Sequence, residues 1–383
     1  MADQTGGAQT APEAGQQTGG GQAGPPTEGA EAGRGPGAVR VTFGLDTFGD
    51  VTRTSDGRPV PQHQVLRDVV EQGVAADRAG VDHFSVGEHH RDDFAVSSPD
   101  VVLAAIAART QHVTLGSAVT VLSSDDPVRV YERFATLDGI SGGRAEIQVG
   151  RGSFVESFPL FGYDLADYDE LFEEKLDLLV RLRSEGPVTW EGRTRAPLSG
   201  RRAWPTTQRG RLPVWVGVGG TPESVVRTAR HGLPLMLAII GGAPARFVPF
   251  VELFHRAVRE LNGADAVVPP VGVHSPGFVA ESDDEARELL FPHFKANRDR
   301  IGAERGWPPM TRDDFEAEAD EGALFVGSPD TVARRIADVV RTLGVQRFDL
   351  KYAHGPLPHE HLVRAIHLYG TEVAPRARAL LAT

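Results

Sequence analysis

The stretch Val81-Asp-His-Phe-Ser-Val-Gly-Glu-His-His-Arg-Asp-Asp-Phe-Ala-Val-Ser-Ser-Pro99 joins a short apolar segment to a cluster of titratable side chains. Phe84 and Val86 alternate with polar residues and glycines flank the segment, which predicts a buried strand. Glu88-His89-His90 follows directly. In parallel α/β folds active-site residues gather at the carboxyl ends of strands, so we expect a functional site here. A solvated loop whose histidines only form hydrogen bonds is the alternative.

The same alternation of strand and helix continues on both sides of this stretch. The predicted strands span Val39–Asp46, Val81–Val86, His112–Val119, Arg144–Val149, Leu212–Val218, Leu233–Ile240, Val271–Ala280 and Gln346–Leu350. Eight such units predict an α/β protein with a (β/α)₈ TIM barrel that carries insertions. A doubly wound open sheet is disfavoured because the first turn, Asp46–Asp50, lacks the glycine fingerprint of dinucleotide sites.

Helical periodicity and capping residues predict the connecting segments. The predicted helices span Gln62–Ala79, Ser98–Gln111, Pro127–Ile140, Leu165–Arg183, Pro222–His231, Pro244–Leu261, Asp283–Arg305, Pro329–Leu343 and His359–Ala382. Between them, Pro187–Pro205 is rich in tryptophan, proline and glycine, which predicts a small hairpin insertion. A second insertion is expected near Arg305–Gly322.

Composition divides the chain of 383 residues into a tail and one domain. Residues 1–38 contain no aromatic residue and almost no large aliphatic one, which predicts a disordered low-complexity tail. Residues 39–383 are predicted to form the barrel domain. There is no cysteine, which excludes disulfides, thiolate metal sites and cysteine nucleophiles.

The net charge is −12, which disfavours binding to nucleic acid or to an anionic membrane. No segment has the length of a membrane span, and the first residues lack the pattern of a signal peptide. We therefore expect a cytoplasmic protein.

A second cluster of candidate residues follows the fourth and fifth predicted strands. Gly150-Arg151-Gly152 ends one strand, and Gly219-Gly220-Thr221-Pro222-Glu223-Ser224 leads from the next strand into a helix. Glycines let backbone amides approach an anion, the hydroxyls of Thr221 and Ser224 can donate, and a guanidinium can bind phosphate oxygens in pairs. The pattern favours a phosphate site. An ordinary glycine turn with a threonine cap is the alternative.

A third cluster, Gly116-Ser117-Ala118-Val119, ends the third predicted strand. Its small residues either accept a flat aromatic ring or pack inside the barrel. Metal binding by His89, His90 and a carboxylate is disfavoured, because no ligand spacing joins them to a further ligand, and we predict no metal. A Ser-His-Asp hydrolase is disfavoured because no Gly-x-Ser-x-Gly elbow occurs.

In their order along the chain, these segments resemble the bacterial luciferase-like flavin-dependent monooxygenases. The resemblance covers nearly all of Val41–Arg376. Its most specific parts are Glu88-His-His90, Leu115-Gly-Ser-Ala-Val119 with Asp126-Pro-Val-Arg129, Leu137-Asp-Gly-Ile-Ser-Gly-Gly-Arg144, Gly150-Arg-Gly152, and Leu212-Pro-Val-Trp-Val216 with Gly219-Gly-Thr-Pro-Glu-Ser224.

The resemblance implies an oxidoreductase that uses reduced FMN and O₂ to oxygenate a small, hydrophobic organic substrate. It implies that His89 is the catalytic residue, assisting proton transfer. The residues that match cofactor-binding positions are Ala118, Val119, Arg151, Gly219, Gly220, Thr221 and Ser224. Of these, Ala118-Val119 matches a non-prolyl cis peptide against the flavin ring. A separate flavin reductase and a homodimer are also implied.

Two other functions remain open. Part of the superfamily uses the deazaflavin F420 and transfers hydride without oxygen, and a non-catalytic flavin-binding barrel is also compatible with the motifs. Luciferase itself carries a reactive cysteine where this chain has Val149, and nothing indicates an aldehyde substrate or light emission. The loops expected to shape the substrate pocket are Asp46–Pro61, Ser153–Asp164, Gly241–Ala243 and Arg305–Gly322, and Phe154, Phe158 and Phe161 favour a hydrophobic substrate.

Overall fold

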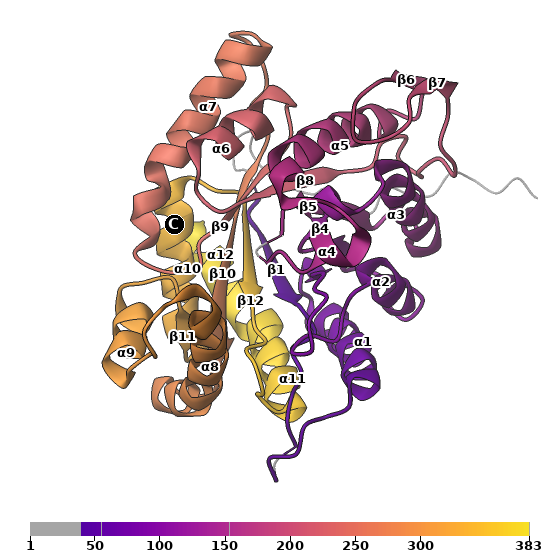
Figure 1. Ribbon diagram of the computed structural model, residues 1–383. Coiled ribbons are helices and arrows are strands. Elements are labelled where there is room, and N and C mark those ends of the chain that lie inside the picture. The colour runs from indigo at the N-terminus through magenta and orange to yellow at the C-terminus, as the bar shows by residue number, and fades with distance from the viewer. Residues whose placement is uncertain (1–39, 55, 153, 383) are drawn as a thin grey trace, which may run out of the picture. The chain divides into compact units, whose positions relative to one another are not determined.

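Eight parallel strands close into a barrel in the computed structural model, which describes residues 40–54, 56–152 and 154–382 (Figure 1). In the order in which they pair, these strands are β1 (Thr42–Thr47), β2 (His83–Val86), β3 (Thr114–Ser117), β5 (Ala145–Gly150), β8 (Val214–Val218), β9 (Leu235–Ala238), β10 (Val271–Val279) and β12 (Arg347–Lys351). Pairing of β12 with β1 closes the ring. The predicted TIM barrel is confirmed. The predicted tail, residues 1–38, lies outside the described residues.

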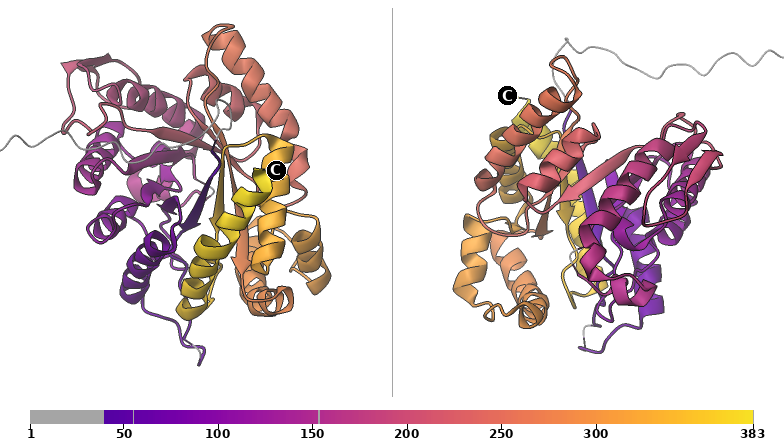
Figure 2. Two further views of the ribbon diagram at one scale, coloured as in Figure 1. Left: turned by 180° about the vertical axis from the view of Figure 1, so that it is seen from behind. Right: turned by 45° about the horizontal axis from the view of Figure 1, so that its top comes forward.

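Helices surround the strands (Figures 1 and 2). They are α1 (Gln62–Ala79), α2 (Pro99–Ala107), α3 (Pro127–Ser141), α5 (Tyr168–Leu182), α6 (Pro222–Arg230), α7 (Val248–Asn262), α8 (Asp283–Arg305), α10 (Pro329–Leu343), α11 (His359–Leu368) and α12 (Ala374–Leu381). The cap at Asp126 acts as the sequence indicates, since its carboxylate accepts hydrogen bonds from the backbone N–H groups of Val128 and Arg129. Ser98 is the N-cap residue of α2, but its side chain makes no capping hydrogen bond. No helix of the described residues has the length and apolar character needed to cross a membrane.

Short elements add to this plan where no periodic pattern announced them. They are β4 (Thr120–Val121), β11 (Phe325–Gly327), α4 (Ser157–Phe161), α9 (Arg312–Asp320) and the single turn η1 (Leu122–Ser124). Two further single turns, η2 (Leu165–Asp167) and η3 (Pro244–Phe247), form the starts of the helical segments predicted from Leu165 and Pro244. The closing helix, expected to run unbroken over His359–Ala382, is divided by a π-helical turn, η4 (Tyr369–Val373). The hairpin predicted within Pro187–Pro205 is present as the antiparallel pair β6 (Val188–Trp190) and β7 (Leu198–Arg201). Such short segments span too few residues to show a hydrophobic period.

The interior of the barrel carries a buried ionic cluster. Arg347 on β12 binds Glu146 on β5 and the Asp349 carboxylate, and only 1% of its surface is exposed. In the closed strand order β12 and β5 lie on opposite sides of the ring, so the guanidinium spans the interior. Burial and the charge of Arg347 lower the pKa of neighbouring His83 to about 3, so this imidazole is neutral at pH 7.

Replacing Arg347 with methionine tests the role of this cluster. The substitution leaves Glu146 and Asp349 buried without their counter-ion, so we expect the free energy of unfolding to fall by about 3–5 kcal/mol. Urea unfolding followed by circular dichroism measures the change. Arg364→Met is the control, since Arg364 pairs with Glu281 and Glu285 at an exposed position. Equal stability of the two variants would contradict the assigned role.

Candidate active site

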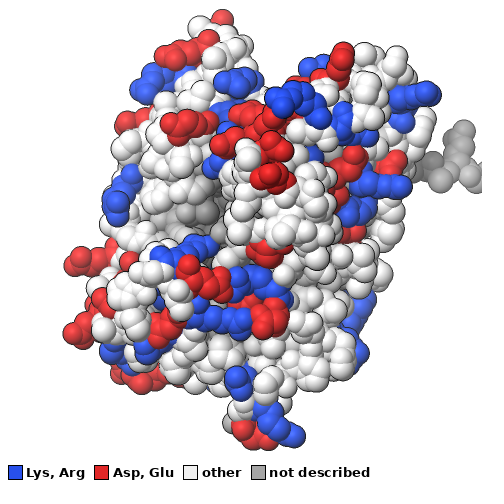
Figure 3. All heavy atoms as spheres, in the orientation of Figure 1, with Lys and Arg blue, Asp and Glu red and all other residues white. Residues whose placement is uncertain are grey.

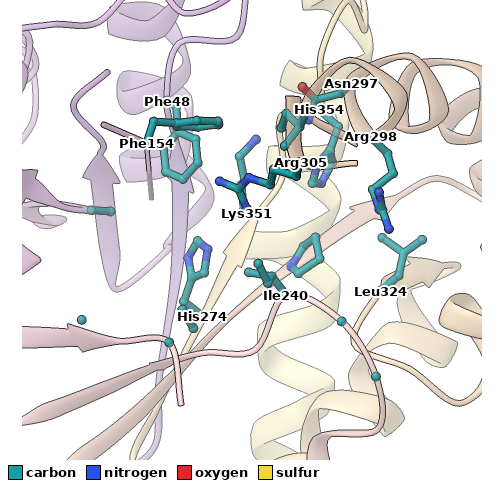
Figure 4. Close-up of a pocket in the computed structure, with 18 of the residues that line it drawn as sticks. Phe48, Phe154, Ile240, His274, Asn297, Arg298, Arg305, Leu324, Lys351 and His354 are labelled. Carbon is teal, nitrogen blue, oxygen red and sulfur yellow. The ribbon is translucent and has the colours of Figure 1, made fainter. Parts of the chain in front are cut away.

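A cavity of about 1080 Å³ opens at the carboxyl ends of the barrel strands. Residues that follow β2, β5, β8 and β9 line one part of it, and α8 and the segment after it line another. All four loops expected to shape the pocket contribute, through Phe48, Phe154, Gly241–Ala243 and residues of Arg305–Gly322. Figure 4 shows Phe48 and Phe154 facing this space from one side and Arg298 and Leu324 from the other.

His89 lies in an aromatic wall of the cavity. Its ring centroid is 4.6–5.1 Å from those of Phe48, Phe94 and Phe154, and 7% of the residue is exposed. Its Nδ1 lies 3.6 Å from a carboxylate oxygen of Glu156. Burial opposes ionisation of Glu156, but His89 and nearby backbone N–H groups outweigh it and lower the pKa of Glu156. An imidazole held against a carboxylate in a cavity can exchange a proton with a bound molecule.

His90 has a different environment from His89. Its Nε2 lies 2.9 Å from Oε1 of Glu88, and its ring contacts Phe161. It lines a second cavity of about 360 Å³, whereas His89 lines the large one. The two adjacent histidines therefore point in different directions, as expected for consecutive residues that leave a strand.

Arg151 and Ser224 form one end of the large cavity. A guanidinium N–H of Arg151 donates to Ser224 Oγ at 3.3 Å, and a second one pairs with the exposed Asp169 at 2.7 Å. The Thr221 hydroxyl donates to the same Oγ at 2.8 Å, so the cluster lies at the first turn of α6. Glu223 is exposed and does not compete for this position. Backbone N–H groups, hydroxyls and a cation together suit an anion.

Arg227 is a further member of this cluster that the sequence motifs did not include. Its guanidinium donates to Ser224 Oγ at 3.4 Å and also binds Glu173. It lies three residues after Ser224 on α6, and residues three apart share one face of a helix. That spacing is the signal in the sequence that could have identified it.

Ala118 and Val119 follow β3, which lies between the strands that precede His89 and Arg151, and the peptide bond between them is cis. Gly150 and Gly217 leave room for Val119: a Cβ atom at either position would lie 2.8 Å or 3.1 Å from a Val119 methyl. Small residues thus shape this part of the wall. Among the candidates, His89, Ala118, Val119, Arg151, Gly219 and Ser224 line the cavity, while Gly220 and Thr221 flank it.

Three phenylalanines were expected to make the pocket hydrophobic, but they do not act together. Phe154 lines the large cavity. Phe158 is fully buried against Tyr168, and Phe161 is half exposed beside His90. Phe158 and Phe161 lie on the short helix α4, whereas Phe154 precedes it, so the three side chains point in different directions. No periodicity in the sequence predicted this helix. The expectation is therefore correct for Phe154 and wrong for the other two.

Charged residues connect the two sides of the cavity entrance. Arg91, in the loop after β2, pairs with Glu304 on α8 at 2.8 Å and stacks on the Phe154 ring at 4.4 Å. Arg300 on α8 pairs with Asp93 at 3.2 Å. Figure 3 shows acidic and basic side chains in close alternation around a hollow on this face. These contacts hold α8 beside the barrel strands.

His274 on β10 and Asp46 on β1 form a second imidazole–carboxylate pair that the motifs did not include. The His274 Nδ1 lies 2.8 Å from Oδ2 of Asp46, and His274 lines the cavity (Figure 4). Burial disfavours a charged His274, but the Asp46 carboxylate outweighs it and raises the pKa of His274 above its ordinary value. The two residues are far apart in the sequence, so no local motif contains them.

The described residues contain no group of three or more His, Asp or Glu side chains that could hold a metal ion.

A family model described as luciferase-like monooxygenase matches residues 42–347, which is most of the chain. The chain belongs to the luciferase-like monooxygenase family. Among curated members, 4-hydroxyprotoasukamycin monooxygenase of Streptomyces nodosus subsp. asukaensis is 28% identical over 319 residues, which cover 78% of this chain and 84% of that protein. Because members of this family are monooxygenases and oxidoreductases, the chain is assigned to the oxidoreductase class of enzymes.

Among solved structures of the same fold, one is in complex with FMN and another is that of a coenzyme F420-dependent enzyme. The oxygenating constituent of 3,6-diketocamphane monooxygenase from Pseudomonas putida, in complex with FMN, has a TM-score of 0.72 at 19% identity, covering 88% of this chain and 98% of that one. The coenzyme F420-dependent tetrahydromethanopterin reductase of Methanopyrus kandleri has a TM-score of 0.60 at 20% identity, covering 88% and 99%. The fold therefore accommodates a flavin-type cofactor of either kind.

The raised pKa of His274 predicts a pH-dependent contribution to stability. A group whose pKa is higher in the folded state stabilises that state below its unfolded pKa, and the contribution is lost as the pH rises through the folded pKa. The difference in unfolding free energy between wild type and His274→Gln should therefore be larger at about pH 5.5 than at about pH 8.5. Urea titrations at several pH values measure it.

His63→Gln serves as the control for this series, because the His63 side chain is exposed on α1. We expect this variant to follow the wild-type profile. A difference for His274→Gln that does not vary with pH would show that Asp46 does not hold His274 protonated.

Proposed function

We propose that this protein is an FMN-dependent luciferase-like monooxygenase that uses reduced FMN and O₂ to oxygenate a small, hydrophobic organic compound. The observation that carries the proposal is the cavity itself. It has a cationic, hydroxyl-rich end at Arg151 and Ser224, a wall of small residues at Ala118-Val119, and an imidazole at His89. A phosphate, a flat ring and a reacting centre each require one of these features.

The residues present fit FMN. Arg151, Arg227, Thr221 and Ser224 offer two cations and two hydroxyls at the first turn of α6, which is the chemistry that a phosphate monoester requires. Their shared position around Ser224 Oγ supports one phosphate group rather than several separate contacts. The exposed Asp169, which pairs with Arg151, is free to turn toward solvent when an anion binds.

When bound, reduced FMN supplies the electrons that activate O₂. The side chains of this chain supply binding and proton transfer. Arg151 and Ser224 hold the phosphate, while Ala118 and Val119 support one face of the ring. His89, with Nδ1 turned to Glu156, holds or releases a proton at Nε2, and the Phe48, Phe94 and Phe154 rings around it keep water away.

The apolar part of the cavity supports a hydrophobic substrate. Phe154, Ile240, Pro276 and Leu324 line the space beyond His89. From the family we also propose that a separate reductase supplies the reduced FMN, and that the protein acts as a homodimer in the cytoplasm.

An F420-dependent oxidoreductase that transfers hydride is the second candidate. The likeness in fold to the F420-dependent reductase supports it. A non-catalytic flavin-binding barrel would bind flavin and give no turnover.

Removing one phosphate contact tests the proposal. Arg151→Ala should weaken FMN binding by about 1.5–3 kcal/mol, because a charge-assisted hydrogen bond to the phosphate is lost. Riboflavin, which lacks the phosphate, should bind wild type and Arg151→Ala equally. Calorimetric titration with FMN, riboflavin and F420 measures these affinities.

Arg193→Ala is the matched control, because Arg193 is 81% exposed and pairs with Glu170 outside the cavity. It should leave all three affinities unchanged. Binding of F420 alone would move the function to hydride transfer, and binding of neither cofactor would refute a flavin-type enzyme. Equal weakening of FMN and riboflavin by Arg151→Ala would place the phosphate elsewhere.

A further inference from the structure

The His274–Asp46 pair occupies a part of the cavity that the proposed function leaves without a role. His274 lies on β10 and Asp46 on β1, and β12 separates these two strands in the barrel. The Asp46 side chain is 1% exposed, whereas that of His274 is 12% exposed and reaches the cavity. The carboxylate is therefore behind the imidazole, and the imidazole faces the space where a substrate would bind.

Asp46 determines which nitrogen of His274 is available. Nδ1 is occupied by the contact with Asp46 Oδ2 at 2.8 Å, so this nitrogen carries a proton. Nε2 has no hydrogen bond to any residue in the described part of the chain, and Figure 4 shows the ring directed into the cavity. A nitrogen in this position can donate to an acceptor on a bound molecule.

Other basic side chains beside His274 are already engaged. Lys351 Nζ donates to Asp50 at 3.1 Å and to the carbonyl of Ala353. His354 Nε2 contacts the carbonyl of Gly277 at 3.3 Å, and this residue is 2% exposed. Lys351 and His354 thus already bind protein acceptors, whereas the Nε2 atom of His274 has no such partner among the described residues.

The charges that face His274 come from two strands and the segment after β12. Asp46 on β1 and Asp349 on β12 favour its protonated form, whereas Lys351 opposes it, and the neighbouring His354 is neutral because burial lowers its pKa. Phe48 stacks on the imidazole, with ring planes 19° apart. Figure 4 shows apolar Ile240 beside it, and Asn297 and Arg305 line the same cavity. A donor with little exposure to water binds an acceptor more strongly than it would in bulk water.

We propose that His274, positioned by Asp46, donates a hydrogen bond from Nε2 to an oxygen of the substrate. The substrate class is then an apolar compound that carries a carbonyl or phenolic oxygen, on which negative charge is stabilised. This inference rests on the proposed function, because it assigns the substrate of the same cavity. It gives the two imidazoles separate roles: His89 serves the cofactor side and His274 the substrate side, with the Phe48 ring in contact with both.

An ionisable dye tests the proposal without knowledge of the natural substrate. 4-Nitrophenol is apolar, carries one phenolic oxygen, and changes colour when it ionises. Bound to the full-length, FMN-free protein, its apparent pKa should fall by about one unit, which corresponds to about tenfold tighter binding of the phenolate. Absorbance titrations over pH at saturating protein measure the shift.

Variants of the pair and of other histidines identify the donor. His274→Gln should abolish the shift, and Asp46→Asn should reduce it, because the imidazole loses its orienting carboxylate. His63→Gln and His112→Gln, which replace exposed histidines outside the cavity, should keep the wild-type shift. Nitrobenzene, which lacks the hydroxyl, should bind wild type and His274→Gln with the same affinity. If Asp46→Asn does not fold, His274→Gln decides the result alone.

Failure of this inference differs from failure of the proposed function. A shift that persists in His274→Gln, or failure of 4-nitrophenol to bind wild type, would overturn the role of His274. FMN affinity serves as the separate readout and should be the same in wild type and His274→Gln. A normal dye shift in a protein that binds no FMN would refute the flavin enzyme while leaving the His274 site in place.

Discussion

The ionic cluster around Arg347 is the constraint on which the barrel depends. The interior of an eight-stranded barrel must be filled by side chains, and here a guanidinium spans it between Glu146 and Asp349. A buried charge destabilises the fold unless it has partners. Arg347 and Asp349 on β12 can pair with Glu146 on β5 only if these two strands face each other across the ring. The closed order of the strands satisfies that requirement, and it fixes where every strand ends.

Two further pairs of a buried carboxylate and a basic side chain lie between this cluster and the cavity. His274 lies against Asp46, and Lys351 lies against Asp50, both nearer the carboxyl ends of the strands than Arg347. The buried carboxylates hold basic groups in fixed positions, so the floor of the cavity is polar and rigid. Its walls, formed by loops and α8, combine aromatic residues such as Phe154 and Trp307 with charged residues such as Arg298 and Glu318. Under the proposed function, a cofactor phosphate and an organic substrate would therefore meet different surfaces of one space.

The sequence predicted those parts of the site whose residues are neighbours within one loop. Glu88-His-His90 and Gly219–Ser224 are continuous motifs, so their chemistry is visible in the order of residues. Arg227 lies one helical turn after Ser224 and contacts its hydroxyl, so it belongs with the second motif. His274 and Asp46 lie on strands more than two hundred residues apart, and each in isolation looks like an ordinary strand residue. Pairing between strands brings them together.

The sequence by itself predicted the barrel, because strand and helix patterns alternate along the chain, and its ordered motifs carried the resemblance to the family. It also determined which residues could bind an anion, since that chemistry lies in two turns. Only the tertiary structure decided that His89 faces the large cavity while His90 faces another, and that Phe158 and Phe161 leave the pocket. The physical reason is that side-chain direction and cross-barrel partners depend on how separate strands and loops pack, and no single stretch of residues encodes that packing.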